Sequence, residues 1–212
     1  MGKYDFFDLD PYSVHQKIVK FVGEQKKVLD IGCAEGNLSK QMKINKCEVF
    51  GIEIDVESAK VAEKYCKDIF IGNVESIKLQ EEYENYFDFI IFADVLEHLK
   101  EPSRVLKRFE KYLKEDGYII VSLPNIANWR MRLKLLTGHF EYEDHGLLDN
   151  GHLKFFNEKS AKRLLLDSGF EIVKFDITVG NLKRFAKFFY SIGSMWPNLL
   201  AFQFLIIANK KQ

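Results

Sequence analysis

The sequence has no excess of charge of either sign, and it has few of the residues, proline and glycine, that interrupt helices and strands. Its 212 residues include 31 Lys and Arg against 31 Asp and Glu, so the formal net charge at pH 7 is zero. This balance favours neither nucleic acid nor an anionic membrane as a partner. The 4 prolines and 13 glycines are spread out and form no low-complexity linker. We therefore expect a single domain over residues 1–212.

Cysteine is scarce, and long apolar runs are missing. The three cysteines, Cys33, Cys47 and Cys66, are an odd number without metal-ligand spacing, which predicts free thiols in a reducing cytoplasm. No apolar run reaches the roughly 20 residues of a membrane span. The first residues, MGKYDFFDLDPYS, lack the apolar core of a signal peptide. We expect a cytoplasmic protein without integral membrane association and without a nucleic-acid partner.

What the sequence does contain is a strand that runs into a glycine turn and then a helix. Residues 27–38, KVLDIGCAEGNL, begin with an apolar run, turn through Gly32 and Gly36, and continue as a helical pattern. This arrangement holds mononucleotide-type ligands at the carboxyl end of a parallel sheet, and glycine lets a ligand approach the backbone. The acids Asp30 and Glu35 disfavour a diphosphate and favour a ligand that carries a cationic amine.

Two further predicted strands end in polar residues where such a ligand needs them. The strand over 48–53 ends in Glu53, whose carboxylate suits both hydroxyls of a ribose. The strand over 68–72 is followed by Asn73, whose amide pairs with an adenine edge. The next residue, Val74, offers its backbone N–H to the same ligand.

Strand and helix alternate through this part of the chain. A fourth strand over 87–92 leads into Asp94, Val95 and His98, at the sheet edge where ligands bind. The alternation predicts an α/β protein with a parallel sheet that is covered on both faces. The remaining predicted strands and helices lie near 27–31, 117–122, 37–44, 56–66, 76–82 and 102–113.

Five segments together resemble the class I S-adenosylmethionine (SAM) dependent methyltransferases. They are VLDIGCAEG, GIEID, IGNVE, FDFIIFADVLEHL and LKEDGYIIVSLPN, which cover about residues 27–125 in order. The resemblance implies a Rossmann-like, doubly wound sheet of seven mostly parallel strands in the order 3-2-1-4-5-7-6. It also implies SAM as cofactor, S-adenosylhomocysteine as product, and no metal. The SAM-binding residues would be Asp30, Gly32, Cys33, Ala34, Gly36, Glu53, Ile54, Asn73, Val74, Asp94, Val95 and His98.

Residues 124–157 interrupt the alternation and are predicted to form a lid on the substrate side, because long excursions in compact domains are usually functional. The segment holds three of the five histidines. The spacings between His139, His145 and His152 match no compact metal-ligand motif, so we expect no metal there.

A hydroxyl acceptor needs a base near neutral pH. The expected catalytic residues are His152, His145 and Asp94, with Asp144 and Asp149 as alternatives in the lid. Spacing alone does not choose among them, and each also has an ordinary structural interpretation.

Two flanking segments complete the prediction. Residues 1–25 are expected to form an N-terminal helical cap beside the ligand. Residues 181–199 carry apolar side chains at helical spacing, which predicts a core-facing helix. A homodimer surface or a loose membrane contact are the alternatives for this stretch.

The predicted reaction is methyl transfer from SAM to a small-molecule hydroxyl. The preferred acceptor is a sugar or polysaccharide-linked group, because residues 124–156 resemble a stretch in methyltransferases associated with sugar and polysaccharide biosynthesis. A quinone-type or lipid-type O-methyltransferase is one alternative. A protein that binds SAM without catalysis, as a regulator or scaffold, is another.

Overall fold

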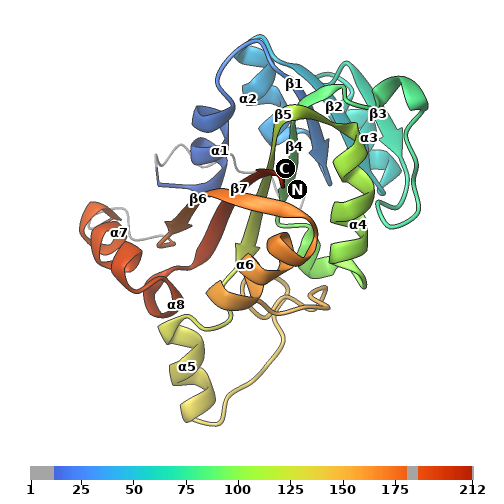
Figure 1. Ribbon diagram of the computed structural model, residues 1–212. Coiled ribbons are helices and arrows are strands. Elements are labelled where there is room, and N and C mark those ends of the chain that lie inside the picture. Colours follow the sequence, from blue (N-terminus) through green and yellow to red (C-terminus); the bar gives the residue numbers. More distant parts are fainter. Residues whose placement is uncertain (1–11, 181–185, 212) are drawn as a thin grey trace.

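The computed structural model describes residues 12–180 and 186–211, and it is built around one seven-stranded sheet (Figure 1). The strand order is β3-β2-β1-β4-β5-β7-β6, which confirms the predicted order. Strands β1 to β5 are parallel, and β7 is antiparallel to both of its neighbours. The strands are β1 (Lys27–Ile31), β2 (Glu48–Glu53), β3 (Asp68–Ile71), β4 (Phe87–Ala93), β5 (Leu113–Pro124), β6 (Phe170–Thr178) and β7 (Gln203–Lys210).

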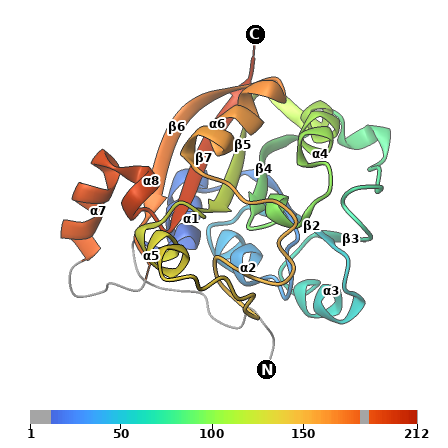
Figure 2. The same ribbon diagram turned by 90° about the horizontal axis from the view of Figure 1, so that it is seen from below.

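Helices cover both faces of the sheet (Figure 2). The α-helices are α1 (Val14–Val22), α2 (Asn37–Ile44), α3 (Val56–Ala62), α4 (Pro102–Phe109), α5 (Trp129–Leu136), α6 (Glu158–Asp167), α7 (Ala186–Met195) and α8 (Pro197–Leu200). Short 3₁₀ helices are η1 (Glu81–Tyr83), η2 (Leu96–His98) and η3 (Glu110–Tyr112).

Alternating residues of the central strands belong to two apolar layers. On one side, Val28 and Ile91 pack in a cluster with Ile18 of α1 and Met42 of α2. On the other side, Leu29 and Ile90 pack with residues of α4 and α6, among them Leu106, Phe109, Ala161 and Leu165. The strands are therefore apolar on both faces, as parallel strands under two helical layers must be. Polar side chains that could bind a ligand are therefore found at the ends of the strands.

The helix predicted over residues 76–82 is wrong. The backbone carbonyl of Asn73 accepts from Ile77 N at 2.8 Å, which closes a turn instead of starting a helix. Further along, the Tyr112 hydroxyl accepts from Leu79 N at 2.9 Å and donates to Leu79 O at 3.1 Å. A tertiary contact to a fully buried tyrosine thus takes the backbone groups that a helix would have used, and only η1 forms.

The lid segment is anchored at its start by two asparagines. Both Asn125 Nδ2 and Asn128 Nδ2 donate to Ala201 O at 2.8 Å, which ties the end of β5 to the start of β7. Helix α5 follows and projects from the body of the sheet (Figure 1). Within α5 only Met131 is buried, where it packs against Leu147 and Leu148. The lid therefore rests on a small apolar cluster of its own.

The 181–199 stretch is only partly described, since residues 181–185 lie outside the described residues. Helix α7 runs through Gly193 and ends at Met195, shortly before Pro197 begins α8. Gly193 is buried. It packs so closely on β6 that an added Cβ would lie 2.8 Å from Ile177 Cδ1. Met195 and Trp196, by contrast, are 72% and 60% exposed. The segment thus packs on the sheet through one side, and a homodimer through it stays a prediction.

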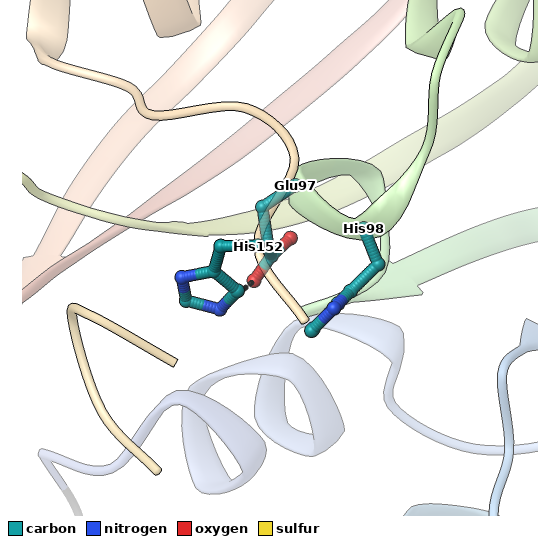
Figure 3. A group of neighbouring side chains, drawn as sticks. All are labelled: Glu97, His98 and His152. Atoms are coloured by element: carbon teal, nitrogen blue, oxygen red, sulfur yellow. Dashed lines mark ion pairs between the residues drawn. The ribbon is translucent and has the colours of Figure 1, made fainter. Parts of the chain in front are cut away.

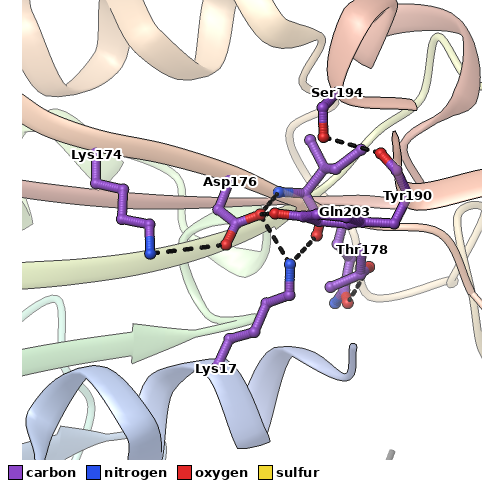
Figure 4. A network of polar contacts seen from close by, with 8 residues as sticks. Lys17, Lys174, Asp176, Thr178, Tyr190, Ser194 and Gln203 are labelled. Carbon is purple, nitrogen blue, oxygen red and sulfur yellow. Dashed lines mark hydrogen bonds and ion pairs between the residues drawn. The ribbon is translucent and has the colours of Figure 1, made fainter. Parts of the chain in front are cut away.

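Helix α1, the described part of the predicted cap, is fastened to the far edge of the sheet (Figure 4). Lys17 Nζ donates to Asp176 Oδ1 at 2.8 Å, and the Tyr190 hydroxyl donates to the same oxygen at 2.7 Å. Burial alone would raise the pKa of Asp176, but these two bonds lower it overall. Burial and the bond to Asp176 raise the pKa of Tyr190 to about 12, so it stays a donor. The network joins α1, β6 and α7.

Candidate functional site

The turn after β1 is held in a left-handed backbone conformation by its own packing. Gly32, Ala34 and Gly36 have φ values of 66°, 47° and 79°. A Cβ at Gly32 would lie 2.7 Å from Val95 Cγ2, and one at Gly36 would lie 3.0 Å from the backbone of Ala62. Protein atoms already fill the space beside both glycines. The turn therefore requires glycine for steric reasons, and ligand contact at these positions stays a prediction.

Glu53 at the end of β2 fixes this turn from the side. Its Oε2 accepts from Ala34 N at 2.8 Å, and its Oε1 accepts from Ile54 N and Asp55 N at 2.8 and 2.9 Å. A carboxylate offers about four lone-pair positions, so one position is left for a ligand hydroxyl. Binding both hydroxyls of a ribose would require that Glu53 share or release one of these backbone bonds.

Asp30 is a buried carboxyl under the same turn. It is 2% exposed, and Ser39 Oγ of α2 donates to its Oδ2 at 2.7 Å. Burial raises the pKa of Asp30 to about 7, although the Ser39 bond opposes this shift. A cationic amine nearby would favour the ionised form. This environment suits the ammonium end of SAM, in keeping with the cationic amine that the sequence predicts for the ligand.

Cys33 contributes its backbone to the turn and not its thiol. Its Sγ lies 2.8 Å from the position that a Cβ would take at Gly51, next to Cys66 Sγ. A hydrogen bond with Cys66, together with burial, raises the pKa of the Cys33 thiol. The side chain is therefore an uncharged part of the packing between the turn and β2.

The ends of β2 and β3 lie side by side, since Glu53 pairs with Ile71 in the parallel register. Ile54 is 64% exposed at this edge, an apolar surface that suits a flat base. Asn73 Oδ1 accepts from Glu75 N at 2.8 Å and keeps one lone pair. Val74 is partly buried, and its carbonyl accepts from Arg108 Nη2. Their predicted adenine contacts stay predictions.

Asp94 follows β4 with a φ of 56°, a conformation that is uncommon without glycine. The chain holds it there from two neighbouring strands. Ser122 Oγ donates to Asp94 Oδ1 at 2.7 Å, and Gln203 Nε2 donates to both carboxylate oxygens at 2.8 Å. Residues in rare backbone conformations cluster at functional sites when their surroundings impose them.

The lid brings His152 back to the 3₁₀ helix that follows Asp94 (Figure 3). Glu97 O accepts from Leu153 N at 2.8 Å and from Lys154 N at 2.9 Å. His98 Nδ1 is bonded to Gly151 O at 2.9 Å, and the rings of His98 and His152 lie 4.8 Å apart. Backbone and side-chain contacts thus close the lid over the end of β4.

Burial shifts the pKa of two ionisable groups in this contact, in opposite directions. Burial, and secondly the charge of Asp94, raises the pKa of Glu97 well above its ordinary value. Burial, and secondly His98, lowers the pKa of His152. At neutral pH His152 is therefore uncharged, and its Nε2 lies 4.0 Å from Glu97 Oε1.

A pocket of about 230 Å³ lies between this contact and the start of β7. It contains all three predicted catalytic residues, although they come from distant parts of the chain. It does not include His139, which lines a separate hollow beside α5. Sequence reasoning missed Glu97, which lies in the quoted EHL segment, and Gln203, for which the sequence gives no signal. The lining residues are Asp94, Glu97, His98, Pro124, His145, Gly146, Leu147, Asp149, His152, Phe202 and Gln203.

The strand order, the glycine turn after β1 and the acid that ends β2 define a class I SAM-dependent methyltransferase. The comparisons with known proteins agree. A family model described as a methyltransferase domain matches residues 10–174, so the chain belongs to this methyltransferase family. Membership implies SAM as the cofactor.

The sequence is similar to that of two curated methyltransferases over part of their length. A ubiquinone biosynthesis O-methyltransferase of Psychrobacter arcticus is 28% identical over 165 residues, which are 74% of this chain and 63% of that protein. An (S)-coclaurine N-methyltransferase of Papaver somniferum is 30% identical over 105 residues, 47% of this chain and 30% of that protein. The chain therefore spans less than two thirds of either relative.

Solved structures share the fold at low sequence identity. A SAM-dependent methyltransferase of Thermotoga maritima is 19% identical with a TM-score of 0.66, covering 95% of this chain and 90% of that one. The [4+2]-cyclase SpnF is 15% identical with a TM-score of 0.65, covering 93% and 80%. Within the described part of this chain, no helix is both long enough and apolar enough to cross a membrane.

Proposed function

We propose that the protein transfers a methyl group from SAM to a hydroxyl of a small quinol-type molecule bound in the pocket. The observation that carries this proposal is the position of the pocket. It opens at the carboxyl end of β4, beside Asp94, and its wall holds His145, His152 and Asp149. In open α/β sheets, ligands bind outside the carboxyl ends of the strands.

The residues around β1 and β2 suit SAM. The glycine turn is preformed by its packing against Val95 and Ala62. Glu53 keeps a free lone pair for a ribose hydroxyl, and a cationic partner would stabilise the ionised form of Asp30. When bound, SAM supplies a methyl group on a positively charged sulfur. The chain's own task is to hold the acceptor hydroxyl in line with that methyl and to exclude water.

His152 is the proposed proton acceptor. Its lowered pKa keeps the imidazole neutral at neutral pH, so it has a lone pair with which to take a hydroxyl proton. Asp94 is less suited to this role, because Gln203 and Ser122 already donate to its oxygens. His145 is exposed on the lid side of the pocket and is the second choice.

Two observations favour a quinol-type acceptor over the sugar that the sequence analysis preferred. The relatives found by sequence include several ubiquinone biosynthesis O-methyltransferases. The pocket lining also includes the apolar residues Pro124, Leu147 and Phe202 beside its histidines. A flat ring that carries hydroxyls only at its rim matches such a mixed lining better than a sugar does, because a sugar carries hydroxyls on all sides.

A SAM-binding protein without methyl transfer is the second candidate. The similarity to SpnF, described as a [4+2]-cyclase, supports it, because that protein carries this fold and another activity. Calorimetric titration with SAM and S-adenosylhomocysteine, followed by transfer of labelled methyl to catechols, quinols and sugars, separates the two. We expect binding and transfer to catechols or quinols. Transfer to sugars alone would restore the sugar acceptor, and binding without any transfer would favour the second candidate.

A further inference from the structure

Three side chains in the pocket wall form a group that no comparison accounts for (Figure 3). One carboxylate oxygen of Glu97 and one ring nitrogen each of His98 and His152 lie within 4.8 Å of one another. Glu97 and His98 come from the segment after β4, whereas His152 comes from the lid. Because Glu97 and His98 lie more than 50 residues from His152 in the chain, the spacing of the lid histidines gives no sign of this group.

The group contains buried polar atoms without a partner. Among the described residues, four buried side-chain N or O atoms have no hydrogen-bond partner, and two of them are Glu97 Oε2 and His152 Nδ1. Glu97 is only 1% exposed. Burying such atoms unbonded is costly, so a bound group that contacts both would stabilise this part of the pocket.

His98 is held in the way that metal-binding histidines commonly are. His98 Nδ1 faces Gly151 O at 2.9 Å, and because a carbonyl only accepts, Nδ1 carries the proton and Nε2 keeps its lone pair. Metal-binding histidines commonly donate their second ring nitrogen to a backbone carbonyl in this way. Gly151 is itself held, since its N–H donates to Asp149 Oδ1 at 2.7 Å.

We propose that Glu97, His98 and His152 bind a divalent transition-metal ion through one carboxylate oxygen and two ring nitrogens. Two imidazoles and a carboxylate suit Zn²⁺, Co²⁺, Mn²⁺ or Fe²⁺, whereas Mg²⁺ and Ca²⁺ prefer oxygen ligands. Ligand bonds of about 2.0–2.2 Å require the three atoms to move together by roughly 1 Å from their present separations.

The surrounding charge favours a cation at this point. Asp94 and Asp149 line the same pocket, and both act on Glu97 as like charges. The described wall of the pocket includes neither Lys nor Arg to offset these carboxylates. A divalent ion would hold Glu97 ionised and relieve the repulsion.

The role of the ion in methyl transfer rests on the proposed function, whereas the metal site itself does not. The ion would face the pocket and bind an oxygen of the acceptor, and so lower the pKa of its hydroxyl. His152 would then be a ligand of the ion and no longer the proton acceptor. The remaining open positions of the ion would select acceptors with two adjacent oxygens, such as catechols.

The test is a Co²⁺ titration of the full chain after removal of metals with a chelator. Visible absorption reports the coordination of Co²⁺, and calorimetry gives the affinity and the number of sites. We expect one site, which Zn²⁺ displaces. Glu97→Gln and His98→Ala should each weaken Co²⁺ binding by about 10–100-fold or more. The control, His139→Ala, changes an exposed lid histidine outside the group and should bind Co²⁺ as the unmodified protein does.

Equal Co²⁺ affinity in all three variants, or no binding by the unmodified protein, would overturn the proposal. A thiolate-to-Co²⁺ absorption band would also overturn it, because it would place the ion at the cysteines. Should Glu97→Gln fail to fold by circular dichroism, the half-buried His98→Ala carries the test alone. SAM affinity is measured on the same samples: if SAM binding fails while Co²⁺ binding holds, the proposed function is lost and the metal site stands.

Discussion

Gln203 Nε2 donates to both carboxylate oxygens of Asp94 at 2.8 Å, although 109 residues separate the two. The contact joins the start of β7 to the end of β4, across the intervening β5. It orients a carboxylate whose backbone has a φ of 56°. Gln203 also lines the pocket, so it is a positioning residue for the acceptor side of the site.

Gln203→Ala should lower turnover while leaving SAM affinity nearly unchanged. Hydrogen bonds to a charged group contribute about 1.5–3 kcal/mol each, and without those from Gln203 the described residues leave Asp94 with Ser122 as its side-chain donor. Steady-state kinetics and SAM titration give the two readouts. Thr178→Val is the matched control, since it removes the 3.5 Å bond to Gln203 Oε1 and leaves the contact with Asp94. Equal kinetics in both variants would remove Gln203 from this role.

Glu53→Ala should weaken SAM binding by about 1–3 kcal/mol, because it unpairs a ribose hydroxyl and frees the turn at Ala34. Calorimetric titration with SAM measures the change. Glu57→Ala is the control, an exposed acid on the adjacent helix α3 that forms an ion pair with Lys60. An unchanged affinity in Glu53→Ala would take this acid out of the SAM site.

SAM affinity should rise with pH through about 7. In the free protein burial holds the pKa of Asp30 at about 7, and a bound ammonium lowers that pKa by favouring the carboxylate. Binding therefore releases a proton below pH 7 and no proton well above it, so affinity rises with pH and then levels off. Titrations across this window, in buffers of differing ionisation enthalpy, measure both the affinity and the proton release.

Asp30→Asn provides the control for that pH dependence. The amide removes the titrating group and keeps a hydrogen-bonding oxygen for Ser39. We expect weaker SAM binding with a flat profile near pH 7. A profile in Asp30→Asn that still rises through the same window would assign the dependence to another group.

His152→Ala should leave SAM affinity unchanged and lower turnover, because the residue lies in the acceptor pocket and not beside the glycine turn. In the unmodified protein without a bound metal ion, turnover should also fall as the pH drops below the lowered pKa of His152, where the imidazole becomes charged. The expected loss is about 10²–10⁴-fold, as for removal of a general base. His139→Ala is the control, and normal turnover in His152→Ala would make that residue structural.

Gly36→Ala should destabilise the fold more than Gly138→Ala. Both glycines have a positive φ, of 79° and 78°, which costs a non-glycine residue about 1–2 kcal/mol. At Gly138 a Cβ meets open space, whereas at Gly36 it would lie 3.0 Å from the backbone of Ala62. Urea unfolding of both variants gives the free energies of unfolding. Equal losses would show that the turn relaxes without cost.

Much of the fold could be predicted because its signals are local. The apolar runs of β1, β2 and β4 and the glycine turn after β1 can be recognised within a few residues. The strand ends then follow, because parallel strands place their carboxyl ends at one edge. The prediction of a helix over 76–82 was wrong because the contact that decides this segment is not local. Its backbone is bound to the hydroxyl of Tyr112, 33 residues away, and no local pattern encodes that contact.

The sequence by itself determined the sheet, its order by family resemblance, and the acids that end its strands, since these depend on periodicity and on residue types at fixed spacing. Only the tertiary structure decided which groups meet at the acceptor side. Glu97 and His152 lie 55 residues apart in the chain, and Asp94 and Gln203 lie 109 apart. Their contacts depend on how the lid folds back over β4 and how β7 inserts beside β5, and both are settled by long-range packing.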